Sequence, residues 1–387
     1  MSTAPDTSTA TPSGPDATIR GECWVIFAFD VGRAIDLDRA QALFAPGSGK
    51  AAHRESIKHP RQAPAYFELR PAPLTVDRKA DSVAVSAWRT SPAVEFTLYD
   101  FGAVSVLYQI ELAGPLGSLA TLSECLYENR SLLEDARRKV EDLVRELGTC
   151  VTRPNVLNIV EDYVVYRLGL EGEPPFTDSG AALVSRHSQT LARVLRAECG
   201  ELSQQEVNDA LLCRISYRPS DLCLIDWNAS ILILDEAHDV RTALEFANVE
   251  LLELRYLDDQ LDRALDASGT AAAEKGGFAK LGARQERAEL RRVAELQTEA
   301  SLLFENVNNA IKLIGDQYLA RVYRLAGERL HLPDWDATII RKLETLESLY
   351  EKLADRGTSR RMEVLEWIII VLIAVSTVLS LLPGLTH

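Results

Sequence analysis

The chain has 387 residues, of which 47% are hydrophobic and 26% charged, and its formal net charge is −15 at pH 7. This composition is ordinary for a globular protein, and the length suffices for two domains. The negative charge argues against a nucleic-acid partner, because no excess of basic residues is present to neutralise phosphates.

The first 20 residues form a Ser/Thr/Pro/Ala tract without an apolar core, which predicts a disordered leader and no targeting signal. The near-continuous apolar run Cys23–Val31 predicts a buried strand. A short helix is expected over Asp36–Phe44. Further strands are expected over 65–70, 83–88, 94–98 and 104–112, and this number of short strands favours a mixed or antiparallel sheet.

From Leu116 the apolar residues recur at helical spacing as far as Gly148, and 163–168 again has the composition of a strand. Helices are expected over Ala181–Glu198 and Ser203–Leu212. Strands follow over 213–217 and 222–234, the second broken near Asn228 into a hairpin. The sequence thus predicts an α+β head over 21–235. The six cysteines form no C-x-x-C pair, and we interpret them as small buried residues.

After residue 235 the pattern is helical. A helix over 239–266 carries an apolar stripe that includes Leu244, Leu254 and Leu261, and we interpret its acidic opposite face as solvent-exposed. A small-residue turn at 269–282 precedes a helix over 283–330, roughly 70 Å long, and another helix begins at Asp334. The expectation is a long antiparallel helical stalk over 236–357 that packs on other subunits, giving a homo-oligomer.

The last segment, 358–387, predicts a single transmembrane helix, because it carries no charged side chain from Trp367 onward and matches the roughly 30 Å hydrocarbon core of a bilayer. Three arginines on its N-terminal side indicate that the body stays in the cytoplasm of a bacterial cell, with the short C-terminus outside the inner membrane. The flank consists of Arg356, Arg360 and Arg361, and the lipid-facing anchor of Trp367, Ile368, Ile369, Ile370, Leu372, Ile373, Val375, Val378, Leu379 and Leu382.

Three short motifs match known chemistry only in part. Ala45–Lys50 lacks the glycine and the Ser/Thr that a phosphate-binding loop requires. Asp235-Glu-Ala-His238 has the helicase magnesium motif without an upstream phosphate loop, so we interpret it as a strand running into a helix. Asp100-Phe-Gly102 is interpreted as a hairpin turn. The histidines do not cluster with carboxylates, and the sequence predicts no catalytic, cofactor-binding or metal-binding residue.

Two segments carry a resemblance to a known family: Leu365-Glu-Trp-Ile-Ile-Ile-Val-Leu-Ile373, and the acidic helix around Val249–Leu261. Together they resemble the C-terminal part of the required-for-meiotic-nuclear-division (YagE-type) proteins. This resemblance implies a membrane-anchored, oligomerising protein without an established enzymatic activity.

We therefore expect an oligomeric scaffold or assembly protein, bound to membrane lipid through its C-terminal helix and using no cofactor. The alternative is a divalent-cation transport subunit, because an α+β head, long helices and a C-terminal span also resemble the plan of CorA-type magnesium transporters.

Overall fold

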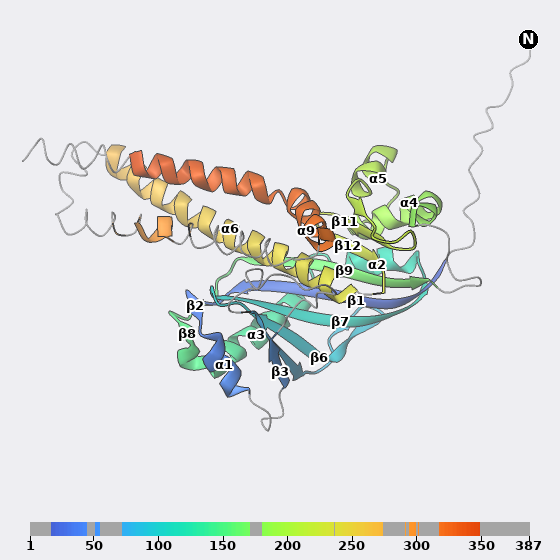
Figure 1. Ribbon diagram of the computed structural model, residues 1–387, viewed down its shortest axis with the longest axis horizontal. Coiled ribbons are helices and arrows are strands. Elements are labelled where there is room, and N and C mark those ends of the chain that lie inside the picture. The colour runs from blue at the N-terminus through green and yellow to red at the C-terminus, as the bar shows by residue number, and fades with distance from the viewer. Residues whose placement is uncertain are drawn as a thin grey trace, which may run out of the picture. The chain divides into compact units, whose positions relative to one another are not determined.

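The computed structural model describes residues 17–44, 51–54, 72–170, 180–235, 237–273, 291, 294–298, 301 and 317–348. A ten-stranded sheet has the order β10-β11-β12-β9-β1-β7-β6-β4-β3, with β5 beside β6 (Figure 1). A second, two-stranded sheet joins β2 (Ala34–Ile35) to β8 (Val151–Thr152). The strands of the large sheet are β1 (Thr18–Asp30), β3 (Ala51–Arg54), β4 (Leu74–Lys79), β5 (Ala84–Val85), β6 (Trp88–Leu98), β7 (Ala103–Pro115), β9 (Val160–Leu170), β10 (Arg214–Ile215), β11 (Leu222–Ile225) and β12 (Ala229–Ile233).

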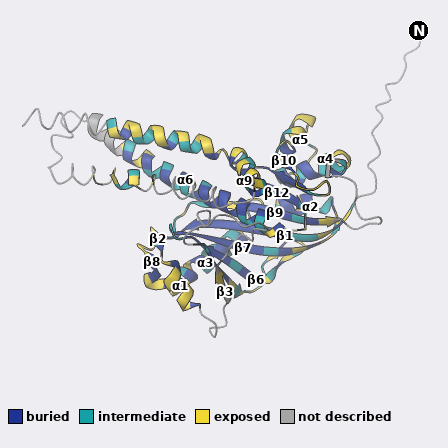
Figure 2. Ribbon diagram, in the orientation of Figure 1, coloured by how far each residue is buried: buried dark blue, intermediate teal, exposed yellow. Residues whose placement is uncertain are grey.

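Strand β1 is antiparallel to both of its neighbours, β7 and β9. Every residue of the predicted run Cys23–Val31 is buried, which confirms the buried strand (Figure 2). Side chains of a strand alternate between faces, so Val25 and Phe27 lie on one face of the sheet and Trp24 and Ile26 on the other. Both faces must therefore be covered by helices.

The helices are α1 (Leu37–Leu43), α2 (Ser118–Leu126), α3 (Arg130–Leu147), α4 (Gly180–Arg196), α5 (Gln204–Ala210), α6 (Ala237–Ala273), α9 (Gln317–Arg329) and a further helix over 332–348. Apolar residues of α2, α3, α4 and α5 join Val25 and Phe27 in one core. On the opposite face the Arg241 guanidinium of α6 lies 5.7 Å from the centre of the Trp24 ring. Figure 1 likewise shows α3 and the first part of α6 on opposite faces of the sheet.

Helix ends follow from local sequence. The Asn129 side chain accepts a hydrogen bond from the Leu132 amide at 3.0 Å and so caps the start of α3, and Gly148 ends that helix with a φ of 52°. Asp36 caps α1 through the Arg39 amide in the same way. The helix predicted over Asp36–Phe44 and the end predicted at Gly148 are confirmed.

The contact between α6 and the sheet is unusually polar. Arg241 pairs with Glu95 of β6 at 2.6 Å, Asn248 donates to the Glu161 carbonyl oxygen at 3.3 Å, and Arg255 pairs with the Glu161 carboxylate. Glu245 and Glu250 are 1% and 3% exposed. The acidic face of this helix was predicted to be exposed to solvent. The structure corrects this for Glu245 and Glu250, which are buried, whereas farther along α6 the Asp262 side chain is 56% exposed, as predicted.

Burial raises the pKa of Glu161 from 4.5 to about 7, although the Arg255 guanidinium acts in the opposite direction. The folded state therefore holds this proton more tightly than the unfolded state, so the free energy of unfolding should fall as pH rises from 4.5 to about 7, by no more than about 3 kcal/mol. Glu161→Gln should remove this part of the pH dependence. Denaturant titrations of both proteins at pH 5 and pH 7.5 test this, and equal pH slopes would refute it.

The described residues fall into two compact units, one within Met1–Arg255 and Leu303–Pro333, the other within Tyr256–Leu302 and Asp334–His387. The first contains the large sheet, the start of α6 and all of α9. In the second, Lys342 pairs with Asp258 and Asp262 of α6 at 2.6 and 2.5 Å, and Leu261 and Ile339 are buried.

The predicted antiparallel stalk over 236–357 is wrong. The part of α6 before Tyr256 belongs to the sheet-containing unit, as does α9, where Phe246 and Tyr323 lie with ring centres 6.1 Å apart. A stripe of apolar residues on a helix does not distinguish packing on another helix from packing on a sheet. The helix predicted over 239–266 lies within α6, whose first part lies on the sheet, while much of the helix predicted over 283–330 lies outside the described residues.

The predicted membrane architecture is also corrected. Of the helices that the structure describes, none combines the length and apolar composition needed to cross a bilayer. The predicted anchor and its arginine flank, 356–382, lie outside the described residues, as do residues 1–16 of the predicted leader and the motif at 45–50. The single-pass topology and the inner-membrane location are therefore withdrawn.

Candidate functional site

The most developed polar cluster surrounds Asp226, in the turn between β11 and β12. Asp226 is fully buried, and its Oδ1 accepts a hydrogen bond from the Trp227 amide at 2.8 Å. The backbone of the same residue accepts a hydrogen bond from the Tyr163 hydroxyl at 2.9 Å and donates one to the Ala229 carbonyl oxygen at 2.9 Å. The break predicted near Asn228 is thus a tight turn held from several directions.

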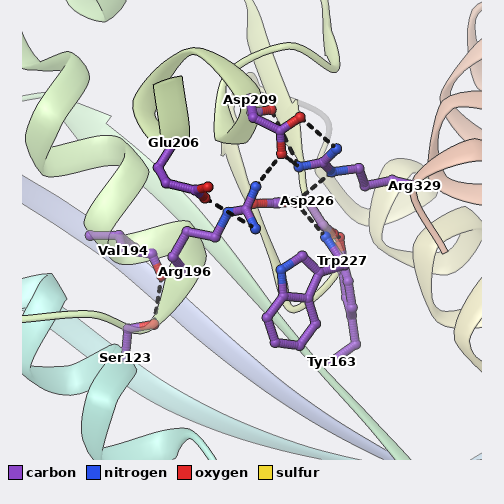
Figure 3. Close-up of polar contacts among 9 residues, drawn as sticks. All are labelled: Ser123, Tyr163, Val194, Arg196, Glu206, Asp209, Asp226, Trp227 and Arg329. Atoms are coloured by element: carbon purple, nitrogen blue, oxygen red, sulfur yellow. Dashed lines mark hydrogen bonds and ion pairs between the residues drawn. The ribbon is translucent and has the colours of Figure 1, made fainter. Parts of the chain in front are cut away.

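Two arginines from different helices bind the Asp226 carboxylate (Figure 3). Arg196, the last residue of α4, places Nε 2.8 Å from Oδ2, and Arg329, the last residue of α9, places Nε 2.5 Å from Oδ1. Both arginines also pair with Asp209 of α5. A cation at a helix C-terminus is favoured by the helix dipole. The cluster therefore joins α4, α5, α9 and the β11–β12 turn at one point.

The electrostatics of the cluster are nearly balanced. Burial raises the pKa of Asp226, while the hydrogen bonds from Arg329 and the Trp227 amide and the charges of both arginines act against this rise. Hydrogen bonding from Arg329 lowers the pKa of the more exposed Asp209. Two guanidinium groups thus share two carboxylates, with Glu206 3.9 Å from Arg196 as a weaker third partner. Because these carboxylates are held by ion pairs, they stabilise the turn, and the cluster has a structural role.

Beside this cluster, aromatic side chains reach the surface. Trp227 is 42% exposed and Tyr127, which follows α2, is 44% exposed; their rings meet edge to face with centres 6.3 Å apart. Leu212 is 69% exposed, and the hydrogen bond from the Ile225 amide to the Cys213 carbonyl oxygen places it at the same end of the sheet. We call the surface formed by Tyr127, Glu206, Asp209, Leu212 and Trp227 the hairpin-tip surface.

None of the residues that the sequence singled out belongs to this site. The ten anchor residues and three flanking arginines lie outside the described residues. Asp235 follows β12 and α6 begins at Ala237, so the Asp-Glu-Ala-His motif does join a strand to a helix. Tyr99 and Gly102 form the predicted hairpin turn between β6 and β7. The sequence did not point to the four charged residues of the cluster, Arg196, Asp209, Asp226 and Arg329. The one signal for their position was the break predicted at the turn residues 226–228.

The family comparison identifies what class of chain this is. The family model described as "Uncharacterized protein MJ0711, N-terminal domain" matches residues 20–239, more than half of the chain. The chain therefore belongs to that family. Arg196, Asp209 and Asp226 lie inside the matched region and Arg329 lies beyond it.

One curated relative is the "Uncharacterized protein MJ0711" of Methanocaldococcus jannaschii, 25% identical over 258 residues, which are 66% of this chain and 76% of that protein. No solved structure matches the chain. The resemblance to the meiotic-nuclear-division (YagE-type) family is thereby corrected: it relied on an acidic amphipathic helix and an apolar tail, and neither pattern is specific to one family.

Proposed function

We propose that this protein is a self-assembling scaffold, which binds further copies of itself through the hairpin-tip surface. The observation that carries the proposal is the exposed aromatic pair Tyr127–Trp227 beside a turn that is held by buried ion pairs. Tyrosine and tryptophan are enriched among the residues that dominate binding energy at protein interfaces. A large apolar ring left half-exposed in this way is typical of an interaction surface.

The rigidity of the turn supports the same function. Asp226 fixes the Trp227 backbone, so little conformational entropy is lost when a partner covers the ring. The surface also includes two acidic residues whose charges are paired within the chain. Asp209 and Glu206 are 46% and 52% exposed, and both lie against Arg196. Because Arg196 pairs with both acids within one chain, two copies of the surface can meet across a two-fold axis, as a symmetric dimer requires.

Removing one aromatic ring should weaken self-association of the full chain. We expect Trp227→Ala to raise the dissociation constant by about thirtyfold or more, the ratio that corresponds to a contact worth about 2 kcal/mol. Sedimentation velocity over a concentration series measures this directly. Leu43→Ala is the matched control, because Leu43 is 49% exposed at the end of α1. A wild-type chain that stays monomeric throughout, or a Trp227→Ala variant that associates like the control, would refute the proposal.

A further inference from the structure

A second feature of the fold lies at the other end of the β11–β12 hairpin. Strands β9 and β12 run parallel to each other, whereas every other strand pair that the structure describes is antiparallel. Their pairing ends at Leu232 and Arg167, whereas β9 continues to Leu170 alongside β1. The two strands therefore separate at their carboxyl ends.

The chain leaves these two strands toward opposite faces of the sheet. The helix after β9 is α4, whose Leu191 and Leu195 belong to the core on the Val25 face. The helix after β12 is α6, which lies over Trp24 on the other face. Where neighbouring parallel strands lead to helices on opposite faces, a crevice opens outside their carboxyl ends, and ligands of α/β proteins bind in such crevices.

A pocket of about 350 Å³ occupies this place. Its lining has opposite charges on its two sides, as the strand order dictates. Arg20 and Arg167 come from β1 and β9. Asp221 directly precedes β11 and Asp235 follows β12, and Ser220 lies beside Asp221 in the chain. The lining is completed by Gly21 and Gly169 and by the apolar residues Leu168, Ile233 and Leu234.

Arg167, Asp221 and Asp235 each have a partner nearby, and the two sides of the pocket keep their opposite charges. Arg167 lies 3.6 Å from Glu22, a long ion pair between partly exposed groups. Asp221 accepts the Arg218 amide at 3.0 Å, and the Arg218 guanidinium lies 3.5 Å from Asp235, whose side chain is 89% exposed. Such exposed pairs are weak, so an incoming charge can compete for them.

We propose that this pocket binds a small zwitterion: a molecule that carries a carboxylate and an ammonium group on a short, partly apolar backbone. The carboxylate lies toward Arg20 and Arg167, because guanidinium groups bind carboxylates with charge-assisted hydrogen bonds. The ammonium group lies toward Asp221 and Asp235. The volume suits a ligand the size of an amino acid or short peptide. This site is separate from the hairpin-tip surface, at the opposite end of β11 and β12, so it adds a ligand to a protein proposed above as a scaffold.

Isothermal titration calorimetry on the full chain tests the proposal with glycine, dialanine and trialanine as probes. At least one of these zwitterions should bind. N-acetylation of that probe, which removes the ammonium charge, and amidation, which removes the carboxylate charge, should each weaken binding about tenfold. Failure of all three zwitterions to bind at millimolar concentration, or tighter binding of inorganic phosphate, would overturn the proposal.

Two variants test which side of the pocket binds the carboxylate of the ligand and which side binds its ammonium group. Arg167→Gln should weaken the zwitterion and its N-acetyl form about tenfold but leave the amidated form unchanged. Asp235→Asn should weaken the zwitterion and the amidated form and leave the N-acetyl form unchanged. Arg138→Gln is the control, since Arg138 is 73% exposed on α3. Binding by both pocket variants equal to that of the control would contradict the assignment, whatever the state of association of the chain.

Discussion

Asp226→Asn should lower the free energy of unfolding by about 3–5 kcal/mol, the usual result of removing one partner from a buried ion pair. Asparagine has the same shape and can still accept the hydrogen bond from the Trp227 amide, so the lost quantity is the charge. Arg196 and Arg329, whose side chains are 18% and 16% exposed, would then keep only Asp209 and Glu206 as counter-charges. Urea titration followed by circular dichroism measures the change.

The matched control for this experiment is Asp142→Asn on α3. Asp142 pairs with Arg145 one turn away, and the two side chains are 60% and 75% exposed. An exposed pair of this kind contributes about 0–1 kcal/mol, so the control should stay close to the wild type. If Asp226→Asn lost no more stability than Asp142→Asn, the ion pairs around Asp226 would not stabilise the folded protein as argued above.

Gly102→Ala should destabilise the protein by about 3–5 kcal/mol, from backbone strain and from overpacking together. Gly102 has a φ of +101°, and a Cβ placed there would lie 1.7 Å from the Gly32 carbonyl oxygen. The clash is with main chain, which cannot move aside as a side chain can. The Val31 amide also donates to the Gly102 carbonyl oxygen at 2.9 Å, so relief of the clash would break a second contact. Thermal unfolding of the variant measures the loss.

Gly114→Ala separates the two causes. Gly114 has a φ of +134°, but a Cβ there would meet nothing within 4 Å. This variant should lose only about 1–2 kcal/mol, the part that backbone strain contributes. Equal losses at the two positions would show that the close approach of Gly102 to Gly32 is unimportant.

A strand of the sheet could be predicted where a short stretch of sequence shows by its own apolar pattern that it is buried. The run Cys23–Val31 is buried on both faces, so its apolar character is continuous, and the sequence alone indicates a strand. The turn residues near Asn228 act on neighbours within a few positions, so the break there was also predicted. Features of this kind need no knowledge of the tertiary fold. The cap at Asn129 was not predicted: the helical spacing over 116–148 gave no sign that the structure divides it into α2 and α3.

The site could not be predicted, because its members meet only in three dimensions. Arg329 is 103 residues from Asp226 and 120 from Asp209, and no spacing within a single sequence connects them. The burial of Glu245 and Glu250 was missed for a related reason. Acidic residues on a helix are normally exposed, and the burial of Glu250 depends on a polar partner from another element, the hydroxyl of Tyr323 in α9.

The apolar stripe over 239–266 predicted a helix correctly but its packing partner wrongly. Leu244 and Leu254 recur at helical spacing, which predicted α6. The same spacing serves a helix that packs on a sheet, and α6 begins on one. The tail at 367–382 was predicted to cross a membrane from its hydropathy, its length and the arginines that precede it.

Hydrogen–deuterium exchange of the full chain at low and high protein concentration tests self-assembly through the hairpin-tip surface most directly. On concentration, slower exchange should appear at Tyr127 and across the β11–β12 turn around Trp227, and it should vanish in Trp227→Ala. Protection that appears elsewhere and leaves the turn unchanged, or no concentration dependence at all, would contradict assembly at this surface.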